Sequence, residues 1–330
     1  MRKDQPVPSF SKRRREMLGG FAAIGLVPGL AMAQPAWKPD RPIKIVVPFP
    51  AGGGADLSAR LLSKGVSERL GQPVIVENRT GASGSIGTDY AYHAAPDGYT
   101  LLAATPDAQA VNPQLYPQKI DNTRFIALSG MTVSGYLLLA RKDLDAATLP
   151  ALIELAYRTP LTYGSAGAGT TFHVLTAAFG AAIQAKEFRH IPYQGASPAI
   201  VALLAGQIDL MMVPDSIAKS YLDRTRVYGV TTAARKETFP DIPTFKEQGI
   251  DVMAESWSGI FAPPGTPAHI ATRIAAAFQE TIRDPAVLRQ LHDSGRSPLL
   301  LSNQQFARFY QDAYAEWGRM IRTAGIEREL

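Results

Sequence analysis

Three times along the chain, a short apolar run leads into a glycine-rich loop and then into an amphipathic helical pattern. The runs cover residues 43–47, 74–76 and 161–163, and the loops after them cover 49–56, 81–85 and 164–171. This order of strand, loop and helix predicts an α/β fold with doubly wound parallel sheets. Further strand-like runs occur at 99–103, 188–191, 208–213 and 227–231, and helical stripes occupy the C-terminal part. We therefore expect two α/β units followed by a helical tail.

The three glycine loops share a position that suits anion binding. At the start of a helix the first backbone N–H groups have no partner within the helix, and they form the positive end of its dipole. Small residues let an anion come close to these groups. In open α/β sheets, ligands bind beyond the carboxyl ends of the strands. One such loop would be explained by a tight turn alone, but three in equivalent places favour a cleft with converging N–H donors.

Nucleotide-binding motifs do not match these loops. The glycines at 52–54 are not followed by the Gly-Lys-Ser/Thr of a phosphate loop. The segment 167–172 starts like a dinucleotide fingerprint and lacks its last small residue. We therefore expect the anion to be a carboxylate, held by N–H groups and by the hydroxyls of Ser165, Thr170 and Thr171.

The first 33 residues have the composition of an export signal. They hold six basic residues against two acidic ones, and so carry +4 of the formal net charge of +5. Arg13 to Arg15 precede an apolar stretch, and Ala31-Met32-Ala33 is a small-x-small cleavage site. Arg14-Arg15 also fits the twin-arginine export pattern. We expect a periplasmic protein cleaved near Ala33, with no basic surface for nucleic acid.

The residues that chemistry would need do not form a catalytic pattern. There is no cysteine, which excludes disulfides, thiolate metal sites and a cysteine nucleophile. The five histidines lack metal-ligand spacing, and no Gly-x-Ser-x-Gly segment is present. We expect no catalytic residue, no metal and no cofactor. A ligand-sensing subunit for a signalling partner stays open as an alternative, and an enzyme acting on a carboxylate is the weaker one.

Several segments together resemble one family. Arg41-Pro-Ile-Lys-Ile-Val-Val-Pro-Phe-Pro-Ala-Gly-Gly-Gly-Ala-Asp56 and Val76-Glu-Asn-Arg-Thr-Gly-Ala-Ser-Gly-Ser-Ile-Gly87 resemble the opening of the tripartite tricarboxylate transporter receptors, also called the Bordetella uptake gene (Bug) family. Matching segments follow in order at 96–101, 163–167, 192–195, 204–209 and 259–267. The resemblance covers nearly all of the chain after the export signal.

This resemblance implies a periplasmic binding protein fold of type II, with two doubly wound lobes joined by crossover hinge strands. Lobe 1 would consist of residues 34–135 and 256–330, and lobe 2 of residues 136–255. The lobes would close on a small carboxylate: an organic di- or tricarboxylate, an acidic amino acid or an aromatic acid. The receptor, a monomer, would then deliver it to the integral membrane permease subunits of the transporter. Hinge candidates are the crossovers near 133–140 and 254–261.

The resemblance also implies which residues bind the ligand. The loop after the first strand and a loop of the second lobe would hold the carboxylate, bordered by the second glycine loop, by Thr105 and by the entrance of a second-lobe helix. These residues are Phe49, Pro50, Ala51, Gly52, Gly53, Asp56, Gly81, Ser83, Ser85, Thr105, Ser165, Ala166, Gly167, Thr170, Thr171, Tyr193 and Gly195.

Asp56, Asp215 and His173 each have two possible roles, and Asp209 has one. Asp56 can hold a water or a ligand hydroxyl, or act as an N-terminal helix carboxylate favoured by the dipole. Asp215 is a candidate contact for an amine or hydroxyl on the ligand, or a plain loop acid. We expect Asp209 to be structural, at the entry of a strand. For His173, in the first turn of its helix, we favour a packed, hydrogen-bonded side chain over a ligand contact.

Overall fold

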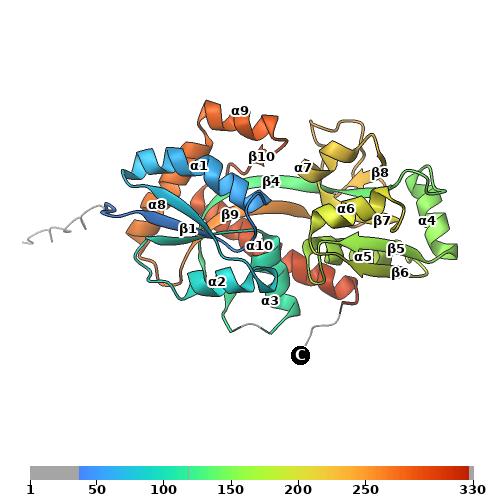
Figure 1. Cartoon of the computed structure of the whole chain (residues 1–330), viewed down its shortest axis with the longest axis horizontal. Helices are drawn as coiled ribbons and strands as arrows, with labels where there is room; N and C mark the ends of the chain where they lie inside the picture. The colour runs from blue at the N-terminus through green and yellow to red at the C-terminus, as the bar shows by residue number, and fades with distance from the viewer. Residues whose placement is uncertain (1–36, 118, 327–330) are drawn as a thin grey trace, which may run out of the picture. The chain divides into compact units, whose positions relative to one another are not determined.

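The computed structural model describes residues 37–117 and 119–326, so the predicted export signal lies outside the described residues. These described residues form one compact unit. Its centre is a ten-stranded mixed sheet in the order β2-β1-β3-β9-β4-β7-β5-β6, with β8 and β10 also paired to β4 (Figure 1). The architecture is α/β, as predicted.

The first sheet half consists of β1 (Ile43–Val47), β2 (Val74–Asn78), β3 (Thr100–Ala104) and β9 (Glu255–Ala262). β1 pairs in parallel with β2 and β3, and β9 runs antiparallel to β3. The connecting helices are α1 (Gly54–Leu70), η1 (Ala82–Gly84), α2 (Ser85–Tyr92), the π-helical η2 (Asp107–Val111), α3 (Asn112–Leu115) and η3 (Asn122–Arg124). The three predicted parallel strands are therefore confirmed.

The second sheet half repeats this pattern with β5 (Leu161–Ser165), β6 (Phe188–Pro192) and β7 (Leu210–Pro214), in which β5 pairs in parallel with both neighbours. β8 (Thr225–Val230) is antiparallel to β4. The helices are α4 (Leu149–Arg158), α5 (Thr171–Ala182), α6 (Ala196–Leu204), α7 (Asp215–Ala218) and η4 (Lys219–Tyr221). In both halves the carboxyl ends of parallel strands lead into loops and helix N-termini.

The strand β4 (Ile126–Arg141) belongs to both sheet halves. Its first part pairs with β9 and β10, and its second part pairs with β7 and β8, always antiparallel. Nearly all of its residues are buried. The sequence predicted crossovers at 133–140 and 254–261, but not one continuous strand of 16 residues.

The C-terminal part contains α8 (Ala268–Ile282), α9 (Pro285–Asp293), β10 (Ser297–Pro298) and α10 (Asn303–Thr323). Phe306 and Tyr310 on α10 pack in a core with β9, whereas Trp317 and Met320 pack in the core of the second sheet half. α10 thus contributes to both cores. The division into lobes at residues 135 and 255 stays a prediction.

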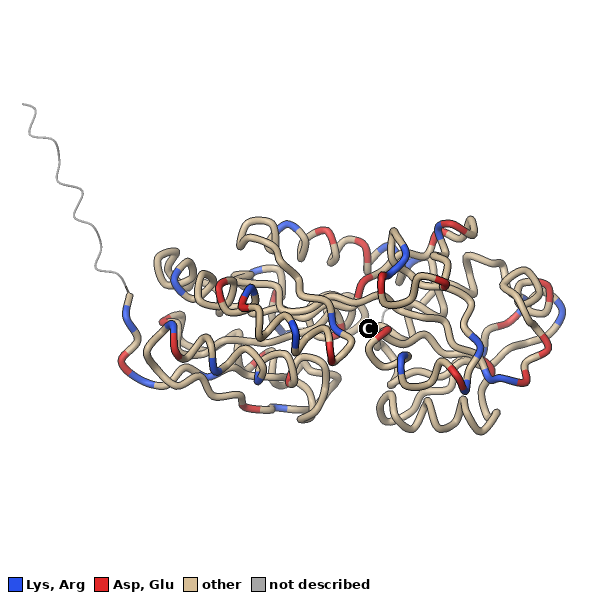
Figure 2. Tube along the Cα trace, turned by 90° about the horizontal axis from the view of Figure 1, so that it is seen from above, with Lys and Arg blue, Asp and Glu red and all other residues tan. Residues whose placement is uncertain are grey.

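Charged residues are spread over both sheet halves. Figure 2 shows Lys and Arg interspersed with Asp and Glu along the chain. Several form ion pairs with residues close in the chain, such as Arg158 with Glu154 on α4 and Arg189 on β6 with Glu187 just before it. Among the helices of the described residues, none has the length and apolar character needed to cross a membrane.

Asp209 joins three strands of the second sheet half. Its Oδ2 accepts hydrogen bonds of 2.8 Å from both the N–H and the hydroxyl of Thr162, and its Oδ1 accepts one of 2.9 Å from Arg141 Nε. These contacts agree with the predicted structural role.

We expect Asp209→Ala to lower the free energy of unfolding by about 2–3 kcal/mol, because two partly buried donors of Thr162 and the guanidinium of Arg141 lose a charged acceptor. Asp209→Asn, which keeps an acceptor oxygen, should lose less. Urea unfolding at pH 7 measures both differences. Equal stability of wild type and Asp209→Ala would contradict this role.

Candidate functional site

The carboxylate of Asp56 holds the first glycine loop in shape. It accepts hydrogen bonds from the N–H of Gly52 (2.9 Å), from Arg60 Nε (3.0 Å) and from Asn78 Nδ2 (2.9 Å). Asn78 Nδ2 also donates to the carbonyl oxygen of Phe49, so the two ends of the loop are tied to β2. Asp56 is buried. These contacts give Asp56 a role in the shape of the loop, and contact with a ligand stays a prediction.

Asp56 is charged in this setting. Burial raises the pKa of its carboxyl, but the hydrogen bonds from Arg60, Gly52 and Asn78 outweigh burial and lower the pKa below its ordinary value of 3.8. A depressed pKa in the folded state stabilises the fold above the unfolded-state pKa, and this contribution is lost as pH falls through the folded-state pKa.

We therefore expect Asp56→Asn to lower the free energy of unfolding by about 1–2 kcal/mol at pH 7. The difference from wild type should stay constant from pH 8 to pH 5 and shrink below about pH 4. Urea unfolding across this range gives the difference. A difference that grows on acidification would have the wrong sign for a depressed pKa.

The glycines of the first loop leave room beside the start of α1. A Cβ atom on Gly52 or Gly54 would meet no atom within 4 Å. The N–H groups of the first turn of α1 have no acceptor within the helix, as in any α-helix. No side chain caps this N-terminus either, so no capping side chain accepts from these groups. Main-chain donors next to open space can receive a carboxylate.

The second glycine loop packs against the first and against the segment after β3. A Cβ on Gly84 would lie 3.1 Å from Phe49 Cζ and 3.2 Å from the Cβ of Ala108, so these residues meet at Gly84. Ala82 and Ser83 adopt left-handed φ angles of 45° and 51°. Asn112 Nδ2 donates to the carbonyl oxygen of Ser83, which ties the loop to α3.

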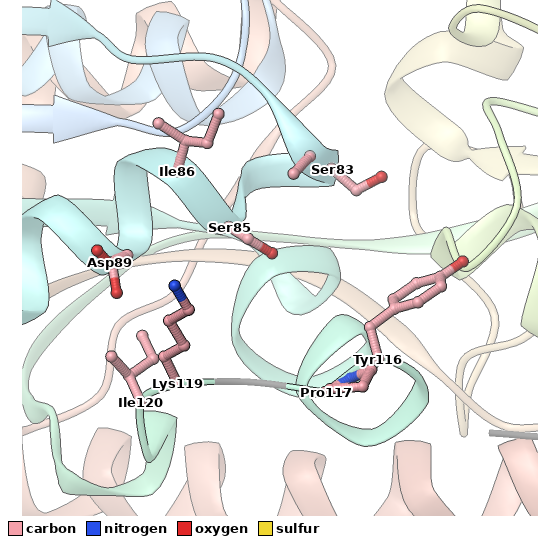
Figure 3. A pocket seen from close by; sticks show the side chains of 9 residues that line it. Ser83, Ser85, Ile86, Asp89, Tyr116, Pro117, Lys119 and Ile120 are labelled. Atoms are coloured by element: carbon pink, nitrogen blue, oxygen red, sulfur yellow. The ribbon is translucent and has the colours of Figure 1, made fainter. Parts of the chain in front are cut away.

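A pocket of about 660 Å³ opens beside this second loop. Figure 3 shows Ser83, Ser85 and Asp89 on one side and Tyr116 and Lys119 on the other. The remaining lining residues are Ala82, Ile86, Pro117 and Ile120. Of these nine residues, sequence reasoning named only Ser83 and Ser85. The residues after α3 carry no local motif and reach the loop only in the folded chain, so the sequence did not indicate them.

Asp107 connects the two sheet halves. Its Oδ2 accepts from the hydroxyl of Thr105 (3.2 Å), and its Oδ1 accepts from the N–H of Thr171 (2.8 Å). Burial raises the pKa of this carboxyl, and hydrogen bonds from Thr171 and Thr105 oppose that rise. The side chain of Asp107 therefore accepts from the N–H of Thr171, and contact of Thr171 with a ligand stays a prediction. Sequence reasoning missed Asp107, because nothing near it in the chain indicates a contact with α5.

Two hydroxyl groups of the third glycine loop donate hydrogen bonds to the main chain of the same loop. Both Ser165 and Thr170 donate to the carbonyl oxygen of Gly167, at 2.8 Å and 2.7 Å. The N–H of Gly169 donates to His173 Nδ1 (3.2 Å), which confirms the predicted packed, hydrogen-bonded histidine. Gly167 and Gly169 have φ angles of 133° and 71°, which favour glycine. The predicted hydroxyl donors thus shape the loop.

Tyr193 and Gly195 lie beside this loop, and Asp215 is the first residue of α7, directly after β7. The N–H of Tyr193 donates to the carbonyl oxygen of Ser165, and Gly195 precedes α6 with open space around its Cβ position. Asp215 accepts from the N–H of Gly135 on β4 (3.1 Å) and lies 3.6 Å from Lys236 Nζ. Burial raises the pKa of Asp215, although Lys236 opposes this. Asp215 thus lies at the carboxyl end of β7, the parallel neighbour of β5, and bonds to the crossover strand β4, and its contact with a ligand stays a prediction.

The loops at the strand ends therefore form one chain of contacts. Phe49 meets Gly84, Gly84 meets Ala108, and the neighbouring Asp107 binds Thr171 at the start of α5. The described residues contain no group of three or more His, Asp or Glu side chains placed to bind a metal ion.

The comparisons with a family model and with related proteins agree with each other. The family model described as "Tripartite tricarboxylate transporter family receptor" matches residues 58–326. A UPF0065 protein of Bordetella pertussis is 34% identical over 323 residues, which cover 94% of this chain and 98% of that protein.

Solved structures agree with this match. The structure of R. palustris Rpa4515 with adipate has a TM-score of 0.78 and 31% identity, and covers 88% of this chain and 99% of its own. Malate-bound MatC from Rhodopseudomonas palustris has a TM-score of 0.75 and 29% identity, with coverages of 86% and 99%. The periplasmic binding protein BugD has a TM-score of 0.76 and 28% identity, with coverages of 88% and 100%.

Proposed function

Because the chain belongs to the tripartite tricarboxylate transporter receptor family, we propose that it captures a small carboxylate at the glycine loops and delivers it to membrane permease subunits. The observation that carries this proposal is the chain of contacts from Phe49 through Gly84 and Asp107 to Thr171. It joins the strand ends of both sheet halves, which is where ligands of α/β proteins bind.

The ligand we propose is a dicarboxylate, held mainly by main-chain groups. Two structural neighbours are described with adipate and with malate, both of which are dicarboxylates. In this chain the hydroxyls of Ser165 and Thr170 are engaged within their loop. The first-turn N–H groups of α1 are therefore the donors we assign to a ligand carboxylate.

Capture would proceed by closure. A carboxylate first binds the N–H groups of one sheet half, and bending of β4 and β9 then brings the loops of the other half onto it. Exclusion of water strengthens the hydrogen bonds in the closed state. In this scheme the Asp107–Thr171 contact keeps the start of α5 aligned with the first sheet half.

We place the protein in the periplasm as a monomeric receptor, cleaved near Ala33. BugD is described as a periplasmic binding protein, and the export signal expected from the sequence agrees with that location. A receptor in this compartment meets its solute before the permease does. The role is binding and release rather than catalysis.

Thermal unfolding of the purified protein with and without malate, adipate and their uncharged diamides tests the function. An acid present at ~100 times its dissociation constant stabilises by about 2.7 kcal/mol, which appears as a raised midpoint. We expect at least one acid to raise the midpoint and the diamides to leave it unchanged. If folded, ligand-free protein responds to no member of a wider carboxylate panel, the proposal is wrong.

A further inference from the structure

Two histidines form a stacked pair under the third glycine loop. The ring centroids of His173 on α5 and His190 on β6 lie 3.9 Å apart, with an interplanar angle of 12°. Tyr163 on β5 stacks beside His190 at 5.1 Å. Both imidazoles are partly buried. At this separation two protonated rings would repel each other, so the stacking disfavours a positive charge on both.

The hydrogen bonds of the pair define which nitrogen carries a proton. His173 Nδ1 accepts from the N–H of Gly169, so its lone pair is in use and the ring is neutral with its proton on Nε2. His190 Nε2 lies 2.6 Å from the hydroxyl oxygen of Ser165. A proton added to His173 Nδ1 would turn this acceptor into a donor facing the N–H of Gly169.

Gly169 is held from both sheet halves. Its Cβ position would overlap the ring of Tyr116, so this ring lies directly on the glycine. Ser165 and Thr170 converge on the carbonyl oxygen of Gly167, two residues earlier. Loss of the Gly169 hydrogen bond would therefore disturb the turn of the third glycine loop.

The surroundings of the pair favour the neutral state. Burial lowers the pKa of His173, and burial together with the neighbouring His173 lowers the pKa of His190 to about 4. The titratable groups around the pair are Tyr163 on β5, Tyr116 after α3 and Asp107 bonded to the start of α5, and Arg189, next to His190 in the chain, pairs with Glu187 just before β6. Because both pKa values are lowered, the neutral imidazoles dominate at pH 6.5 and above, and protonation follows as pH falls below this ordinary value.

We propose that His173 is a positioning residue of the third glycine loop, and that carboxylate binding there requires a neutral His173–His190 pair. The inference rests on the proposed function and adds its pH dependence. Simple charge attraction would make acidification strengthen the binding of an anion. The geometry gives the opposite sign, because protonation of His173 removes the acceptor that holds Gly169.

The test uses variants matched at one atom. In His173→Asn the amide oxygen stands near the place of Nδ1, accepts from Gly169 and does not titrate. His173→Leu removes the acceptor. Calorimetry at pH 7.5 and pH 4.5 gives the dissociation constant for malate or adipate. We expect this constant to rise at least fivefold in wild type on acidification, and to rise less in His173→Asn. His173→Leu should bind weakly at both pH values. Equal pH dependence in wild type and His173→Asn, or tighter binding at pH 4.5, would overturn the proposal.

A second measurement does not depend on the ligand. Nitrogen-15 NMR of the imidazoles at pH 7 should show His173 Nδ1 unprotonated and Nε2 protonated, with a hydrogen-bond coupling or shift at the Gly169 amide that His173→Leu loses. A protonated Nδ1 at pH 7 would overturn the inference. If malate and adipate both fail to bind wild type while the Nδ1 assignment holds, the ligand class is wrong and the positioning of Gly169 by His173 still stands.

Discussion

Gly54→Trp is expected to weaken binding of the captured acid more than 100-fold while leaving the fold intact. Gly54 is the first residue of α1, is exposed, and has no atom within 4 Å of its Cβ position. A side chain can therefore leave the backbone there without a clash, and we expect tryptophan at this exposed position to change stability by about 0.5 kcal/mol or less. The side chain would fill the space beside the first-turn N–H groups that we assign to the carboxylate. Calorimetric titration with the best acid of the panel measures the effect.

Two controls separate blocking from other causes. Gly54→Ala adds one methyl group at the same position and should keep affinity within a few fold. Lys64→Trp places the same indole on an exposed position of α1 away from its N-terminus. Gly52 and Gly167 are poorer test positions, because their φ angles of 84° and 133° strain any side chain. Full affinity in a folded Gly54→Trp variant would remove α1 from the binding site.

Gly87→Ala is expected to lower the free energy of unfolding by about 3 kcal/mol. A Cβ at this position of α2 would lie 2.5 Å from the carbonyl oxygen of Arg79 and 2.8 Å from Pro48 Cα. Both are backbone atoms, so the helix itself would have to move away from the ends of β1 and β2. Alanine favours a helix by about 1 kcal/mol over glycine, and this gain is smaller than the expected loss.

Gly54→Ala serves as the matched control, since it adds the same methyl group where no neighbour stands. Urea unfolding of both variants should show a large decrease for Gly87→Ala and a change near zero for Gly54→Ala. Because the second glycine loop at the start of α2 packs against Phe49 of the first glycine loop, Gly87→Ala should weaken acid binding as well. A Gly87→Ala variant as stable as wild type would contradict the packing described here.

Local patterns sufficed for the parallel strands and their loops. The run at 43–47 is followed at once by glycines and a helical stripe, and each of these signals depends only on neighbouring residues. β4 was harder because it is buried on both faces and shows no polar alternation over 16 residues. Its antiparallel partners lie far away in sequence, so neither its length nor its shared position in both sheet halves could be read from the chain.

The candidate site shows the same limit. The glycine loops were predicted from their place before helices, but the partners that shape them were not. Asp107 reaches Thr171 over 64 residues, and Tyr116 reaches Gly169 only after both sheet halves are folded. The hydroxyls of Ser165 and Thr170 were assigned to a ligand, yet a nearby carbonyl oxygen satisfies both. Short polar side chains commonly bond to neighbouring backbone in this way.

A crystal structure of the protein grown with the acid that gives the largest rise in unfolding midpoint tests the central claim most directly. We predict a carboxylate of that acid about 2.7–3.2 Å from main-chain nitrogens of residues 54–56, with the loop 164–171 closed against the same molecule. An ordered acid bound only in the pocket between Ser85 and Lys119, or anywhere away from both loops, would contradict the account.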